Sequence, residues 1–273
     1  MSDALMEVRS ELCHEPTEKR LRATAGGETV IDSAGGLLVW EPRRISPAFA
    51  APEPDVRAEL SPSAAPALTE KPPPVLHPGV RFRVHSTPGT ELDVRVAGTT
   101  LEAAAFRPGD PDLAGYVLLD FDAFDWREED EPIASHPRDP FHRVDVRQSA
   151  RHVRIEYEGV PIADSARPTL VFETQLPVRF YFRREDVIAD LHPGDQRTSC
   201  PYKGDASYFA FDAGGRRVDG LVWSYETTLP DCAQLHGLVS MFDDKFDVYV
   251  DGEHKQPPGS RIASVLLEEF GVS

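Results

Sequence analysis

The sequence is poor in cysteine. Its 273 residues include only Cys13, Cys200 and Cys232, which are widely separated. Three scattered thiols are too few for a disulfide framework or for a zinc site built from cysteine pairs. We therefore expect a reduced protein of the cytoplasm and no metal site, and the composition indicates no particular cofactor.

Long apolar runs and basic residues are also scarce. No stretch is long enough to span a bilayer, and residues 1–24 lack the apolar core of a signal peptide. The 29 Lys and Arg residues are outnumbered by 46 Asp and Glu, which gives a formal net charge of -17. Nucleic acids and anionic membranes bind basic patches, so we expect neither as a partner of this acidic protein.

Short alternating segments separated by Gly, Pro and Asp turns fill most of the chain. In the clearest one, Val153, Ile155 and Tyr157 face one way. This pattern is typical of small antiparallel sheets. The apolar spacing predicts short helices at 55–60, 184–191 and 230–236, and a tail helix from about residue 260 to 270.

The two halves of the chain repeat each other, which predicts two copies of one domain. The matching pairs are 27–33 with 159–165, 40–41 with 172–173, and 55–60 with 186–191. We expect a flexible arm at 1–19, a degenerate first copy at 20–130, a linker at 131–147, an intact second copy at 148–253, and a linker with the tail helix at 254–273. The first copy has a Pro-rich insert and keeps no counterpart of Cys200, Tyr202 or Lys203. We therefore interpret the first copy as structural and the second copy as the one that carries the functional groups.

The stretch from Arg197 to Tyr208 holds the densest mixture of reactive groups in the chain. Cys200 is a candidate nucleophile because neighbouring cations favour its thiolate, although a buried corner residue would look the same. Lys203 and Arg184 are candidates for contact with an anionic group. The alternative for both is a surface ion pair. Gly204 would let a backbone or ligand approach closely beside Lys203.

Four aromatic residues accompany this stretch. We expect the rings of Tyr202, Tyr208, Trp223 and Tyr225 to wall a pocket with their polar atoms at its rim, and the alternative is ordinary core packing. His236 can act as a general base or cap the end of a short helix. The sequence does not decide between these readings.

Several ordered segments of the second copy carry a family resemblance. They are 153–165, 181–187, 198–204 with 206–208, 223–225 and 237–252. With these segments the second copy resembles the bacterial domain-of-unknown-function family 427, sometimes labelled nucleotidyltransferase-like. The resemblance implies a β-tent fold, in which two small antiparallel sheets meet at an angle, and a tandem arrangement with a degenerate first copy. Other β-tent domains hold small ligands, or zinc through cysteine pairs, which this chain lacks.

These observations predict a mainly β protein of two tandem β-tent-like domains with short helices and a C-terminal helix. The expected function is binding of a small polar or anionic molecule in a pocket of the second domain. One alternative is an enzyme that acts on a small polar substrate through Cys200 or Lys203. The other is a protein-interaction scaffold. The sequence does not specify an oligomeric state.

Overall fold

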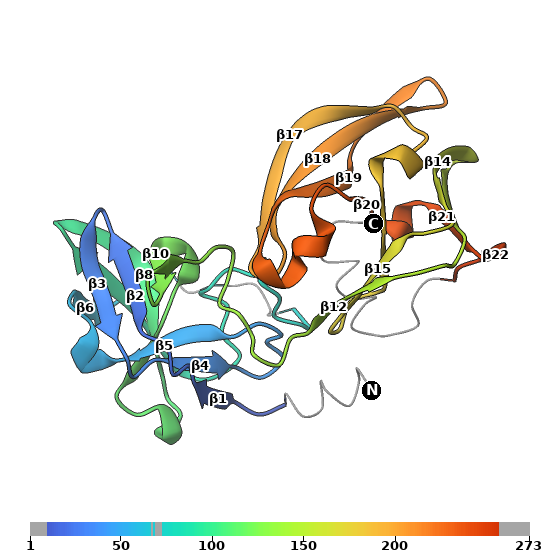
Figure 1. Cartoon of the computed structure of the whole chain (residues 1–273). Coiled ribbons are helices and arrows are strands. Elements are labelled where there is room, and N and C mark those ends of the chain that lie inside the picture. The colour runs from blue at the N-terminus through green and yellow to red at the C-terminus, as the bar shows by residue number, and fades with distance from the viewer. Residues whose placement is uncertain (1–9, 67, 69–72, 257–273) are drawn as a thin grey trace. The chain divides into compact units, whose positions relative to one another are not determined.

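The computed structural model describes residues 10–66, 68 and 73–256 (Figure 1). The chain divides into two compact units, the first ending at Asp139 and the second beginning at Pro140. Both units are built from antiparallel strands and short 3-10 helices, so the expected mainly β fold is confirmed. The tail helix expected from residue 260 lies outside the described residues.

The first unit contains a seven-stranded and a four-stranded sheet. In spatial order the larger sheet is β1 (Cys13–Pro16), β4 (Leu37–Trp40), β5 (Ala48–Pro52), β9 (Tyr116–Leu119), β8 (Thr99–Pro108), β7 (Gly89–Val96) and β6 (Glu59–Pro62). The smaller is β11 (Glu131–Pro132), β10 (Asp125–Glu128), β2 (Leu21–Ala25) and β3 (Glu28–Ser33). Among the described residues the connections of this unit include the 3-10 helices η1 (Glu53–Asp55) and η2 (Pro111–Leu113), within the larger sheet, and η3 (Phe121–Ala123), between the two sheets.

The second unit also has a seven-stranded and a four-stranded sheet. The larger is β12 (Val144–Gln148), β15 (Thr169–Glu173), β16 (Arg179–Phe182), β20 (Val239–Met241), β19 (Arg216–Thr228), β18 (Gly204–Ala213) and β17 (Leu191–Cys200). The smaller is β14 (Val160–Ser165), β13 (Val153–Tyr157), β21 (Asp247–Val250) and β22 (Glu253–His254). Its 3-10 helices are η4 (Arg184–Asp186), η5 (Pro230–Leu235) and η6 (Asp243–Lys245).

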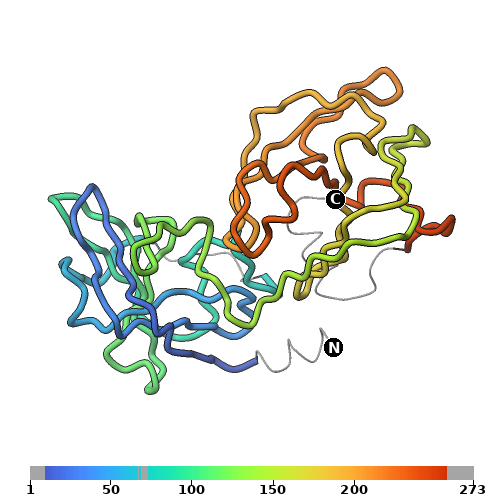
Figure 2. Tube along the Cα trace, viewed as in Figure 1, coloured from blue at the N-terminus to red at the C-terminus, as the bar shows by residue number. Residues whose placement is uncertain are grey.

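The strand order is the same in both units. When the strands of each unit are counted in chain order, each strand of the first unit has a counterpart in the second. The two counterparts occupy the same place in the larger sheet or in the smaller sheet. The trace in Figure 2 can be followed through each unit in turn. The repeat seen in the sequence therefore corresponds to a repeated topology.

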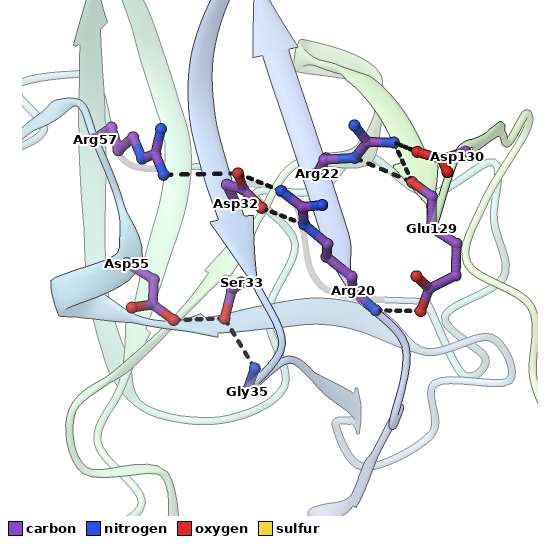
Figure 3. Close-up of polar contacts among 9 residues, drawn as sticks. All are labelled: Arg20, Arg22, Asp32, Ser33, Gly35, Asp55, Arg57, Glu129 and Asp130. Carbon is purple, nitrogen blue, oxygen red and sulfur yellow. Dashed lines mark hydrogen bonds and ion pairs between the residues drawn. The ribbon is translucent and has the colours of Figure 1, made fainter.

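One hydrogen bond, present in both units, accounts for the repeated serine and aspartate. Ser33, at the end of β3, donates to Asp55 at 2.5 Å (Figure 3), and Ser165, at the end of β14, donates to Asp186 at 2.7 Å. Each serine oxygen also accepts from the backbone N–H two residues later. The repeated serine and aspartate thus tie the end of an edge strand to the following 3-10 helix.

The expected short helices are mostly extended chain. Around 55–60 only η1 is helical and β6 begins at Glu59, and in the second unit η4 ends at Asp186. The reason is pairing: Val56 forms a bridge to Ile31, and Val187 forms the equivalent bridge to Ala163. Backbone pairing to the smaller sheet overrides the helical spacing of the apolar side chains. At 230–236 the helix is present as the 3-10 helix η5.

The seven-stranded sheet of the second unit packs on both faces. One face meets the smaller sheet through a cluster that includes Val153, Phe182, Phe211 and Val222. The other face carries an aromatic cluster under η5 and the edge strand β12, formed by Tyr181, Tyr208, Trp223, Tyr225, Cys232 and Leu235 with smaller neighbours. This second face positions the candidate site.

Candidate functional site in the second unit

The turn between β17 and β18 places Lys203 against the end of β15. Its ammonium is hydrogen bonded to Glu173, the last residue of β15. The two side chains are only 10% and 5% exposed. His142 approaches the other oxygen of Glu173 through Nε2 at 3.0 Å, and its ring stacks on Tyr202 with centroids 4.3 Å apart. Glu173, Lys203, His142 and Tyr202 form what we call the Glu173 cluster.

The charges in the cluster hold each other in the ionised state. Burial works to raise the pKa of Glu173, but Lys203 and His142 outweigh it and lower that pKa to about 2. Burial likewise works to lower the pKa of Lys203, and the Glu173 charge raises it well above its ordinary value. A carboxylate and an ammonium are therefore kept together beneath the surface at neutral pH.

The groups around Lys203 stay protonated. Burial raises the pKa of Tyr181 to about 12 and that of Cys232 to about 11, and it raises the pKa of Tyr225 further. The Lys203 charge opposes each of these shifts, so all three groups lie within electrostatic range of its ammonium. At neutral pH these residues offer O–H and S–H groups rather than anions.

Cys200 is the last residue of β17 and pairs with Gly204 across the turn. Its side chain is partly exposed, whereas Cys232 is buried and Cys13 is exposed. Cys200 is near enough to Lys203 to contribute electrostatically to the raised pKa of that lysine. Among the described residues, however, none forms a hydrogen bond to its sulfur, so no general base is in place beside it. The structure brings Cys200 and Lys203 together but leaves the thiol without an activating partner.

The four candidate aromatic residues are buried. Tyr208, Trp223 and Tyr225 belong to the aromatic cluster, whereas Tyr202 is buried and stacks on His142. The Trp223 ring contacts Tyr181, Tyr208 and Phe242 with centroids 4.6 to 6.5 Å apart. These rings pack on one another in the core, as the alternative of ordinary core packing describes.

The backbone conformation and packing around position 204 account for the glycine there. Its φ is +109°, and a Cβ placed there would lie 2.0 Å from the backbone oxygen of Thr227 on β19. The close approach that the sequence indicated is thus made by a neighbouring strand.

Arg184 lies apart from the Glu173 cluster. It is exposed, and its guanidinium stands 5.2 Å above the ring of Phe209. Phe209 packs with the smaller-sheet side of the core, whereas Tyr208 packs with the aromatic cluster, because successive side chains of a strand face opposite ways. Arg184 and Lys203 are therefore on opposite faces of the larger sheet.

A cavity of about 220 Å³ lies elsewhere in this unit. It is lined by charged residues that include Arg179, Asp243, Asp244 and Lys255. Arg179 and Lys255 both bind Asp243, and Arg179 also stands 6.0 Å from the centre of the Trp223 ring. The cavity therefore lies near Trp223 rather than over Lys203. Its cations are already used in ion pairs.

Sequence reasoning missed Glu173 and His142. Glu173 had a usable signal, because the repeat places it on Glu41, and a charged residue that recurs at the end of a buried strand is unusual. His142 gave no such signal. It precedes β12 in a polar connection, and only the pairing of β12 with β15 brings it to Glu173.

Two further observations concern the described residues alone. Over residues 10–66, 68 and 73–256, no group of three His, Cys, Asp or Glu side chains is arranged to hold a metal ion. In that same part of the chain, no helix has both the length and the apolar character needed to cross a membrane.

The second unit is thus a two-sheet β domain with a buried acid–base cluster at the edge of its larger sheet. Residues 145–252 match the model of a family described as a domain of unknown function, DUF427. The match supports the family that the sequence segments predicted for the second half, and membership of the first half stays a prediction. No curated protein matches the chain.

Proposed function

We propose that the second unit binds a small polar molecule at the Glu173 cluster. The observation that carries this proposal is the burial of an ionised Glu173–Lys203 pair with His142 and Tyr202. Replacing a buried ion pair with apolar residues is often neutral or stabilising, so stability alone is a weak reason to keep one. Groups with strongly shifted pKa values that gather in one place are instead typical of functional sites.

The chemistry of the cluster favours a neutral polar ligand over an anionic one. Lys203 is already balanced by Glu173, so it offers directional N–H groups rather than an uncompensated positive charge. His142 is the most exposed of the three charged or titratable side chains, at 16%. A ligand would therefore meet the imidazole first and the buried pair second.

Thermal-shift measurements test this proposal. Neutral sugars, nucleosides and amino acids are compared with phosphates and carboxylates on the wild type and on Lys203→Met. A ligand that binds only the folded state raises Tm, so a neutral compound should raise it in the wild type and not in Lys203→Met. Arg184→Ala is the matched control because Arg184 lies on the opposite face. A shift that survives in Lys203→Met would contradict the proposal.

The alternative is an enzyme that uses Cys200, and the observation in its favour is that Cys200 is near enough to contribute electrostatically to the raised pKa of Lys203. An activated thiol would react with iodoacetamide faster than the exposed Cys13 of the same chain. Equal or slower alkylation of Cys200 would contradict the enzyme alternative and favour the binding proposal.

The cytoplasmic location remains a proposal that rests on the cysteine content.

A further inference from the structure

The cavity of about 220 Å³ in the second unit has room for a ligand of its own. Its walls come from the chain at the start of β16, from η6, and from β21 and β22 with the residues that follow them. Besides the four charged residues named above, they include Pro177, Phe246, Asp247, Val248, His254 and Gln256. One water needs only ~10–15 Å³, so the cavity admits a small organic molecule. No member of the Glu173 cluster lines it, so it is independent of the site proposed above.

The first unit fills the equivalent place with aromatic rings. Phe121 and Trp126 stand there at the positions of Asp243 and Val248, because η3 and β10 of the first unit match η6 and β21 of the second. The two rings stack with centroids 6.0 Å apart and pack in the core. In the second unit the shorter side chains at both positions line the cavity instead. The shared fold is therefore compatible with apolar residues where the second unit has a cavity.

The cations of the cavity also have apolar counterparts. Ala48 and Ile133 of the first unit stand in the same register as Arg179 and Lys255 of the second. Charged groups cost free energy when they are taken out of water, so the fold alone gives a weak reason to bury them here. The replacement of apolar residues by charged ones around a cavity points to a ligand.

The two cations have little to offer to an anionic ligand. Lys255 donates to Oδ2 of Asp243 at 2.7 Å, and Arg179 donates to Oδ1 of the same carboxylate. The Asp243 side chain is 6% exposed, so this ion-paired group is part of the wall. An anion would have to compete with Asp243 for both of its partners.

Asp244 is a second carboxylate of the wall, and it is short of positive charge. Its side chain is 16% exposed, and Arg179 Nη1 lies 3.8 Å from its Oδ1, which is beyond hydrogen-bond distance. Burial raises the pKa of Asp244, and the opposing effects of its own backbone N–H, of Arg179 and of Lys245 do not offset burial. Within the described part of the chain, no other side chain donates a hydrogen bond to it.

The charges around the cavity favour a cation. Three carboxylates, Asp243, Asp244 and Asp247, face the two cations. The oxygen Oδ1 of Asp247 lies 3.3 Å from Nε2 of His254, which leaves Asp244 as the carboxylate for a ligand. With the imidazole counted as neutral, one monovalent cation would balance the lining charges, whereas an anion would add to the excess.

We propose that this cavity binds a small organic cation, whose ammonium group donates hydrogen bonds to the Asp244 carboxylate. The buried side chains of Phe246 and Val248 line the same cavity and supply an apolar wall for the hydrocarbon part of the ligand. An ammonium group provides both the donor and the positive charge that Asp244 lacks.

Backbone-amide NMR of the full ¹⁵N-labelled chain tests the proposal. The protein is titrated with propylammonium, and with 1-propanol and propionate as neutral and anionic probes of similar size. The buffer contains about 0.15 M salt, which screens the general attraction of an acidic protein for cations. We expect saturable shifts of the amides of residues 243–256 with propylammonium alone.

Asp244→Asn should raise the Kd for propylammonium about ten- to a hundredfold, through the loss of a charged hydrogen bond. Burial already disfavours the ionised carboxyl, so this variant should keep its Tm and its loss of binding is not a loss of folding. The matched control is Asp122→Asn, which changes the equivalent carboxylate of the first unit and should leave the Kd unchanged. Val248→Trp places the first unit's ring in the cavity and should abolish the response.

Four outcomes would overturn the proposal. A response to propionate or 1-propanol in place of propylammonium would show that the ligand class is wrong. An unchanged Kd in Asp244→Asn would show that this carboxylate does not hold the ammonium group. Shifts that spread over other acidic surfaces without saturation would indicate general attraction of cations. If no probe moves these amides, the cavity holds water only, and the proposal fails.

Discussion

At the residue scale, Glu41 and Glu173 are two carboxylates that stay ionised in spite of burial. Each has a pKa of about 2 in the folded protein, against an ordinary value of 4.5. A carboxyl whose folded pKa is depressed stabilises the fold above its unfolded pKa, and this contribution is lost as pH falls toward the folded pKa. Both units are therefore expected to weaken in the same acidic window.

We predict that the free energy of unfolding falls between about pH 4.5 and pH 2, with each carboxylate contributing up to about 3 kcal/mol of the loss. Urea unfolding at several pH values, followed by tryptophan fluorescence, measures it. The double variant Glu173→Gln/Lys203→Met removes both charges of the buried pair and should be less acid-sensitive in the second unit. An unchanged pH dependence in that variant would contradict the assignment.

The candidate site residues also show which placements in space follow from the sequence and which do not. Cys200, Tyr202 and Lys203 do lie together, because adjacent residues of one tight turn cannot separate far. Arg184 is 19 positions from Lys203, and strand alternation sends the two to opposite faces. Glu173 and His142 are distant in sequence and reach Lys203 only through strand pairing. Local placement was predictable, whereas the partners were not.

At the scale of the element, the hairpin of β18 and β19 depends on Gly204. A methyl group there would meet the Thr227 oxygen at 2.0 Å, and its φ of +109° is unsuited to other residues. We predict that Gly204→Ala destabilises the second unit by roughly 3 kcal/mol through overpacking and backbone strain. Thermal unfolding measures the loss.

The matched control is Gly214→Ala in the turn of the same hairpin. Gly214 also has a positive φ, of +56°, but a Cβ there meets no atom within 4 Å. Its cost should be about 1 kcal/mol, from the backbone conformation alone. Equal losses for the two variants would show that the approach of Thr227 is unimportant.

The repeated serine–aspartate bond gives a second prediction for elements. Ser33→Ala and Ser165→Ala each leave a half-buried carboxylate oxygen and a backbone N–H without their serine partner. We expect a loss of about 1–3 kcal/mol for each variant, confined to the unit that carries it. Hydrogen exchange of backbone amides, resolved by unit, checks this. Ser33→Ala should leave protection after residue 140 unchanged, and protection lost there would refute the assignment.

At the scale of the whole molecule, each unit has its own hydrophobic core. The cores of the first unit include Leu21, Phe49 and Leu118, and those of the second include Phe182 and Trp223. We predict that a fragment of residues 140–273 folds alone, with the circular dichroism of an antiparallel β protein and a cooperative thermal transition. A fragment that stays unfolded at all temperatures would show that the second unit requires the first.

The sequence by itself determined the β character, and it predicted the repeat and the resemblance of the second half to a family whose model matches residues 145–252. These properties follow from alternation, turn residues and ordered segments, which are local in the chain. Only the tertiary structure decided the sites. It placed Glu173 under Lys203 and Arg179 beside Asp243, and it turned the expected helix at 55–60 into extended chain. Each of these outcomes depends on pairing between segments that are distant in sequence, which a local pattern does not encode.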